Sequence, residues 1–141
     1  MRRTFTELVG DDKVEVNLNK YLVNWKRKVG SNFQLATKLW LSKYWGPDLV
    51  CEELRIPASD GMRCDLVNIS KMIAVEAHGK QHNEYVEHFQ KGCRLNWLNQ
   101  ITRDQYKIEW YRRNGFRLIE IEPQDKLSLG FIREKFGIEI I

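Results

Sequence analysis

Two acidic residues interrupt the most strand-like part of this sequence. Asp65 lies in an apolar-rich segment over 62–69, and Glu76 lies in a second such segment over 72–78. This composition predicts two neighbouring strands of a hairpin. A carboxylate buried in a strand destabilises the fold unless a cation or hydrogen bonds compensate it, so two of them on adjacent strands indicate a shared partner. We expect that partner to be a divalent metal ion.

The length and composition are those of one folded domain. Of the 141 residues, 43% are hydrophobic and 30% are charged, and no apolar run is long enough to span a bilayer. Residues 1–7 lack the apolar stretch of a secretory signal peptide, and Cys51, Cys64 and Cys93 have no Cys-x-x-Cys spacing. We therefore expect a cytoplasmic protein with reduced thiols and no membrane partner.

The excess of basic charge lies at the front of the chain. The formal net charge is +4, and residues 1–48 hold nine Lys/Arg against five Asp/Glu, whereas the rest of the chain has fourteen of each. Apolar spacing over 17–28 predicts a helix that contains Lys20 and ends in Lys26, Arg27 and Lys28. A basic region favours a polyanionic partner, although these side chains fit an ordinary solvated helix end equally well.

Further helices and strands alternate along the remaining chain. Helices are expected over 33–44, 95–114 and 127–136, and strands over 49–56 and 116–122. Gly115 is expected to end the long helix as its C′ residue, with Ile108 and Tyr111 on its buried side. The resulting order is helix, helix, three strands, helix, strand, helix, which predicts an α/β (α+β) fold.

Three short motifs resemble those of a known family. They are Arg63-x-Asp65, Glu76-x-x-Gly79-x-Gln81-His82, and Arg103-Asp104-x-x-Lys107 leading into 114–119. Together with an α-β-β-β-α-β order over about residues 52–122, they resemble the PD-(D/E)XK nuclease superfamily, in particular its very-short-patch-repair-type, phage and homing endonucleases. The resemblance implies a restriction-endonuclease-like αβββαβ core with a mixed sheet of about four strands flanked by helices. Residues 1–48 and 123–141 would complete the same single domain.

The resemblance also implies an activity. It is that of a Mg²⁺-dependent endonuclease, with Mn²⁺ as a substitute ion, which hydrolyses DNA by a metal-activated water in a bacterial or phage-infected cell. Asp65 and Glu76 would hold the metal, because Mg²⁺ binds carboxylate oxygens together with waters and substrate phosphate. Glu52 or Glu53 would be the further acid that many members place upstream, and strand alternation alone does not separate the two. We include Glu53 in the expected site.

One position departs from the pattern of the family. The lysine expected two residues after the second acid is His78 in this chain. We expect His78 and His82 to flank the reacting phosphate, with Gln81 beside them, and Lys107 to supply the fixed positive charge. The basic residues expected to contact DNA are Lys20, Lys26, Arg27, Lys28, Lys80, Arg103 and Arg112.

Several alternatives stay open from the sequence alone. The two acids could form structural ion pairs with Arg63 or Arg117, and the two histidines could indicate zinc, although Gly79 between them suggests a strand end. The chain could also be a catalytically silent nucleic-acid-binding module with the nuclease fold, or a dimeric enzyme that resolves branched DNA. Two intact acids favour the nuclease, because buried carboxylates without a metal destabilise the fold. Both a monomer and a homodimer are compatible with the sequence.

Overall fold

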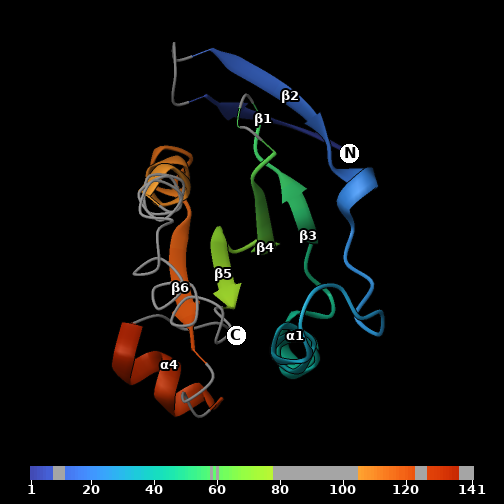
Figure 1. Cartoon of the computed structure of the whole chain (residues 1–141), viewed down its shortest axis with the longest axis vertical. Helices are drawn as coiled ribbons and strands as arrows, with labels where there is room; N and C mark the ends of the chain where they lie inside the picture. Colours follow the sequence, from blue (N-terminus) through green and yellow to red (C-terminus); the bar gives the residue numbers. More distant parts are fainter. Residues whose placement is uncertain (8–11, 58, 60, 78–104, 123–126, 137–141) are drawn as a thin grey trace, which may run out of the picture.

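A four-stranded mixed sheet forms the centre of the molecule. The computed structural model describes residues 1–7, 12–57, 59, 61–77, 105–122 and 127–136 (Figure 1). The strands, in spatial order, are β3 (Val50–Arg55), β4 (Arg63–Asn68), β5 (Ile73–Ala77) and β6 (Arg117–Ile121). Strand β4 is antiparallel to both β3 and β5, and β6 runs parallel to β5. The predicted mixed α/β fold is confirmed, and each of these strands lies within its predicted range.

A hairpin and a helix cover one face of this sheet. The hairpin consists of β1 (Arg2–Thr6) and β2 (Lys13–Asn17), and the helix over 105–113 leads into β6. The ring of Phe5 lies 5.2 Å from that of Trp110, and both belong to a buried cluster with residues of β3, β4 and β5. Both elements appear at the top of Figure 1, where the helix is orange. Aromatic packing therefore fastens the hairpin to the helix and the helix to the sheet.

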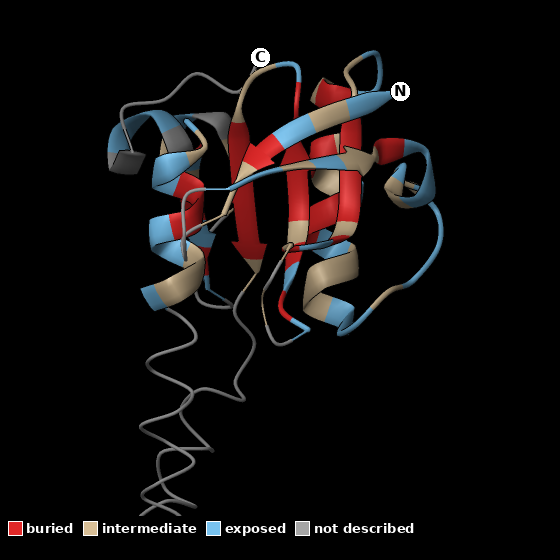
Figure 2. Cartoon of the chain, turned by 90° about the horizontal axis from the view of Figure 1, so that it is seen from above, coloured by how far each residue is buried: buried red, intermediate tan, exposed pale blue. Residues whose placement is uncertain are grey.

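The opposite face packs against α1 (Asn32–Trp45) and α4 (Leu129–Phe136). Helix α1 begins at Ser31, whose hydroxyl accepts the N–H of Gln34, and ends at Gly46. Trp45 is fully buried in a cluster that also holds Ile119 of β6 and is bordered by side chains of α4. Figure 2 shows the strands of the four-stranded sheet as the most buried part of the molecule. Both helices were predicted from their apolar residues.

A specific turn joins the helix over 105–113 to β6. Gly115 has a φ of +79°, and its N–H donates to the carbonyl of Arg112 while the N–H of Phe116 donates to the carbonyl of Tyr111. These two bonds make a Schellman motif with glycine at C′, as predicted. Ile108 was expected on the buried side of this helix, but it is exposed, because Trp110 and Tyr111 take up that side. Residues 95–104 of the predicted helix lie outside the described ranges.

The prediction of a helix over 17–28 is wrong. This region forms the end of β2 and a single 3₁₀ turn, η1 (Leu18–Tyr21), and then continues as an extended segment hydrogen-bonded to the edge strand β3. The side-chain oxygens of Asn17 and Asn24 each accept the N–H of the residue two positions ahead. Such local bonds compete with helical ones, so residues 26–28 lie in a loop and not in the last turn of a helix.

No helix within the described ranges combines the length and apolar character needed to cross a membrane.

Candidate active site

Asp65 and Glu76 meet at the point where β4 and β5 stop pairing. The ladder between these strands ends at the pair Leu66 and Val75, which are the sequence neighbours of Asp65 and Glu76. The N–H of Asp65 donates to Oε2 of Glu76 over 3.2 Å, and the N–H of Ala77 donates to Oδ2 of Asp65 over 3.0 Å. Each carboxylate therefore accepts a backbone N–H of the other strand, as a backbone carbonyl would do in a regular ladder. The structure brings together the two acids that the sequence singled out.

The closeness of the two carboxylates changes the acidity of Asp65. Burial raises the pKa of Asp65 to about 8, and the negative charge of Glu76 and a hydrogen bond to its carboxylate add to this rise, while Lys107 opposes it. Two carboxylates in contact cannot both ionise readily, so near neutral pH they hold a proton between them. A divalent cation would replace that proton, because metal ligands must be deprotonated.

Two side chains from the helix over 105–113 bind Glu76 from the face that this helix covers. The hydroxyl of Tyr111 donates to Oε1 of Glu76 over 2.9 Å, and the ammonium group of Lys107 forms an ion pair with the same oxygen. The two residues are four positions apart and so lie on one side of the helix. Tyr111 is fully buried, and the side chain of Lys107 is 21% exposed. Lys107, which the sequence led us to expect near the reacting phosphate, thus lies at the carboxylate of Glu76.

The acids keep Lys107 positively charged. Burial alone would lower the pKa of its ammonium group, but Glu76, and then Asp65, raise it above its ordinary value. Neither Arg63 nor Arg117 forms an ion pair with either acid within the described residues. The alternative in which one of these arginines compensates the acids is therefore wrong, and the compensating cation is Lys107.

Sequence reasoning placed Tyr111 only in the hydrophobic core. The structure shows that its hydroxyl also lies beside the thiol of Cys64, a buried residue of β4, and that burial raises the pKa of both groups. The hydroxyl is therefore protonated and acts as a fixed donor to Glu76. Its position four residues after Lys107 was the signal in the sequence that could have indicated this role.

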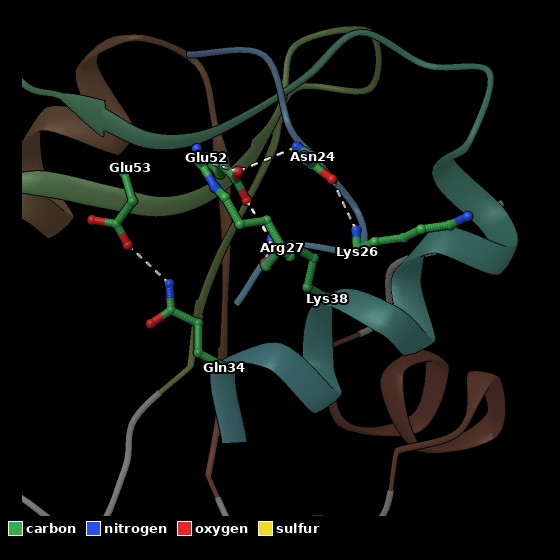
Figure 3. Close-up of polar contacts among 7 residues, drawn as sticks. All are labelled: Asn24, Lys26, Arg27, Gln34, Lys38, Glu52 and Glu53. Carbon is green, nitrogen blue, oxygen red and sulfur yellow. Dashed lines mark hydrogen bonds and ion pairs between the residues drawn. The ribbon is translucent and has the colours of Figure 1, made fainter. Parts of the chain in front are cut away.

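Glu52 and Glu53 have different environments. Glu52 is buried, and its Oε2 accepts from Nζ of Lys38 over 2.7 Å, while its Oε1 accepts from the N–H of Asn24 over 3.2 Å (Figure 3). Because Lys38 belongs to α1, the carboxylate of Glu52 lies on the α1 face of the sheet, whereas Glu76 is bound from the other face. Glu52 already has its cation and serves the fold.

Glu53 is level with the two acids. Residues 52 and 54 of β3 pair with residues 66 and 64 of β4, so Glu53 stands opposite Asp65 in the register. Its φ is +52°, and its carboxylate accepts from Nε2 of Gln34 over 3.0 Å (Figure 3). This conformation is rare for a residue with a side chain and occurs where the surrounding structure imposes it. Register thus places Glu53 level with Asp65, whereas Glu52 and Asp65 line one small cavity beside α1.

The remaining predicted residues fall into two groups. Arg27 forms an ion pair with Glu52, Arg112 forms one with Glu109 on the exposed side of its helix, and Lys20 lies within η1. Lys26 and Lys28 lie in the exposed loop before α1. The residues that lie outside the described ranges are His78, Lys80, Gln81, His82 and Arg103.

The donor set suits a hard cation. No group of three or more His, Cys, Asp or Glu residues arranged around a metal position exists in the part of the chain that the structure describes. Asp65 and Glu76 supply two adjacent carboxylates. Mg²⁺ is commonly held by one or two carboxylates plus waters and substrate phosphate, so these residues fit such an ion.

Comparison with known proteins gives one relative. An uncharacterized protein, 094L, of Frog virus 3 (isolate Goorha) is 36% identical to this chain over 73 residues, which are 52% of this chain and 47% of the viral protein. The match thus spans about half the length of that relative. No family model matches the chain. No solved structure matches it either.

Proposed function

We propose that this protein is a metal-dependent nuclease that hydrolyses phosphodiester bonds of DNA. The observation that carries the proposal is that Asp65 of β4 and Lys107 of the helix over 105–113 both contact the carboxylate of Glu76 of β5. The N–H of Asp65 donates to Oε2, and Lys107 pairs with Oε1. The arrangement of the sheet supports it, because three antiparallel strands followed by a helix and a parallel strand are what the PD-(D/E)XK core would contain. Under this proposal Asp65 and Glu76 are the metal ligands.

Each residue of the site has a chemical task in this proposal. A bound Mg²⁺ would supply an activated water and offset the charge on the attacked phosphate. Tyr111 holds Oε1 of Glu76, and the N–H of Asp65 holds Oε2, so the carboxylate is fixed in direction. Lys107 keeps a positive charge at the acids and can donate to a phosphate oxygen or to the attacking water. It thereby takes the role of the lysine that is replaced by His78.

Cleavage of supercoiled plasmid in the presence of Mg²⁺ tests the proposal. Asp65→Asn and Glu76→Gln should each lower the cleavage rate by at least about 10²-fold, and Lys107→Ala by about 10²–10³-fold. Asp48→Asn is the matched control, because Asp48 is also a partly buried acid paired with a lysine, Lys71, but stands at the other end of the sheet. Cleavage at the wild-type rate by Asp65→Asn protein would refute the proposal.

A second candidate is a catalytically silent nucleic-acid-binding module. It is favoured by the ion pair between Lys107 and Glu76, because this pair compensates the acids even without a metal. Calorimetric titration with Mg²⁺ separates the two candidates, since a silent module would give no binding that depends on Asp65. Including a four-way junction among the cleavage substrates would identify a branched-DNA resolvase.

A further inference from the structure

A polar groove of about 330 Å³ runs beside the edge strand β3. It lies between this strand and the segment that includes η1 and the loop after it. Four of its lining residues are basic, namely Lys20, Arg27, Arg55 and Arg63, and two are acidic, Glu52 and Glu53. We call this feature the β3 groove. Its cations come from three separate segments of the chain, so it is assembled only by folding.

The acids of the β3 groove already have partners. Glu52 is bound by Lys38, a residue outside the groove lining, and by Arg27 at 3.4 Å. Glu53 accepts from Gln34, and Figure 3 shows the two glutamates directed to different partners. With four basic and two acidic side chains in its lining, the groove keeps a net positive charge at its surface.

Two of these cations directly oppose one another. Arg55 and Arg63 are partners in the antiparallel register of β3 and β4, and both are exposed. Within the described residues neither forms an ion pair. Like charges directly opposite each other on a sheet are destabilising, so the pair costs folding free energy unless an anion lies between the two side chains. Guanidinium groups bind phosphate through two parallel hydrogen bonds each, which makes phosphate the anion that suits them.

The arginine pair is close to the candidate active site. Arg63 precedes Asp65 by two residues on β4, and Glu53 lies level with Asp65 on β3. At about 3.4 Å per residue, this spacing puts the backbone of Arg63 roughly 7 Å from that of Asp65 along the strand. An anion held by the arginines would therefore be a neighbour of a group held at the acids.

We propose that the β3 groove binds the sugar-phosphate backbone of the nucleic acid next to the bond that is cleaved. Arg55 and Arg63 clamp one phosphate between them, and Lys20 and Arg27 follow the backbone away from the site. The proposal deepens the nuclease function and rests on it for the choice of a nucleic acid as the anion. It adds two residues, Arg55 and Arg63, to the expected DNA-binding set.

Binding measured without cleavage tests the groove. Fluorescence anisotropy with duplex and single-stranded oligonucleotides, in EDTA and over about 50–200 mM salt, gives the slope of log K against log salt. The Arg55→Gln, Arg63→Gln double variant should reduce this slope by about 0.9 for duplex and about 0.7 for single strands, the values for one lost phosphate contact. The control, Arg2→Gln with Lys43→Gln, loses the same charge at two exposed positions away from the groove and should keep the wild-type slope.

Three results would overturn the proposal that the β3 groove binds nucleic acid. They are an unchanged slope in the Arg55, Arg63 variant, an equal reduction in the control, and a hexaglutamate peptide that binds as tightly as the oligonucleotide through the same two arginines. Thermal unfolding confirms that the variant folds, and its Tm should equal or exceed that of the wild type because repulsion is removed.

The experiments can reject the groove proposal and the nuclease proposal independently of each other. A chain that binds DNA through Arg55 and Arg63 but does not cleave it with Mg²⁺ keeps the groove and loses the nuclease proposal. A chain that cleaves DNA while the double variant binds with an unchanged slope keeps the nuclease proposal and loses the groove.

Discussion

Among single residues, Asp65 shows how strongly the surroundings of the site change the acidity of a side chain. Its pKa is raised from 3.8 to about 8 by burial and by Glu76. An acid whose pKa is raised in the folded state keeps its proton longer there than in the unfolded chain. Stability is therefore unaffected by this group below about pH 4, and falls as the pH rises from about 4 to about 8. Above the folded pKa the whole penalty is present.

Asp65→Asn should make the metal-free protein more stable at alkaline pH. The amide can still accept the N–H of Ala77, and it can donate to Glu76 where the carboxylate repels it. We expect the free energy of unfolding to exceed that of the wild type by up to about 5 kcal/mol near pH 8.5, with the difference shrinking towards pH 4. Urea denaturation in EDTA at several pH values measures it. A difference that does not grow with pH would show that the two carboxylates are not coupled.

Mg²⁺ should reverse this penalty in the wild type. The ion stabilises the ionised pair, so Tm should rise with Mg²⁺ concentration in the wild type and in the Asp48→Asn control, but not in Asp65→Asn. Because binding displaces a proton, the rise should be larger near pH 8 than near pH 6. Thermal unfolding at matched ionic strength measures both effects. An equal rise in Asp65→Asn would place the ion elsewhere.

At the scale of elements, the helix over 105–113 completes the site. Lys107 and Tyr111 reach Glu76 only if this helix keeps its rotation about its own axis. The Schellman turn at Gly115 connects the helix to β6, and Trp110 packs it onto the hairpin. The geometry at the acids therefore depends on how the helix ends.

Gly115→Ala tests that dependence. With φ at +79°, an alanine is strained, although its Cβ would meet only Met72 Cε at 3.8 Å, an ordinary contact. We expect a loss of about 1–2 kcal/mol in stability and a lower cleavage rate. Gly46→Ala is the control, because Gly46 has a helical φ of −50° and tolerates a side chain. Urea denaturation of both variants measures the difference. Equal stabilities would mean that the turn adapts without strain.

The elements also show how far the sequence could predict this molecule. Apolar-rich composition located β4 and β5, and with them Asp65 and Glu76, because strands at the centre of a sheet are buried. Helical spacing was misleading at 17–28, where the same apolar residues also suit an extended chain that lies half-buried against a sheet edge. The hairpin was not predicted, although Val14 and Val16 alternate with polar residues along β2, as is typical of a half-buried strand.

Part of the site could not be predicted from the sequence, because it depends on how the helices and strands pack together. Glu52 and Glu53 are adjacent in sequence, and only the register of β3 and the unusual φ of Glu53 distinguish their surroundings. Tyr111 has the composition of a core residue, and its contact with Glu76 follows from the way its helix crosses the sheet. Neither the register nor the crossing is encoded in local patterns.

In the whole molecule, one buried ion pair links three segments. Lys38 of α1 bonds Glu52 of β3 and the carbonyl of Arg27, and Glu52 accepts from Asn24 in the same loop. Both charged side chains are almost completely buried. The loop that borders the β3 groove is thus held to the sheet and to α1 through these contacts.

Removing one partner of this pair should be severe. Lys38→Met leaves Glu52 buried without its strongest cation, and we expect a loss of about 3–5 kcal/mol. The Lys38→Met, Glu52→Leu double variant should recover much of it, because no buried charge is left uncompensated. A double-mutant cycle by urea denaturation measures the coupling. A cost below about 1 kcal/mol for Lys38→Met alone would mean that water reaches Glu52 freely.

The hairpin is held by a residue far along the sequence, and this determines the order in which parts of the fold can form during translation. Thr6 exchanges two hydrogen bonds with the side chain of Asn114, a residue 108 positions later. A ribosome adds about 5–20 residues per second, so β1 would wait on the order of 5–20 s before the residue that holds it has been made. The lysine beside the acids is synthesised only a few residues before Asn114. During translation, the candidate site would therefore become complete only after β3, β4 and β5 had all been made.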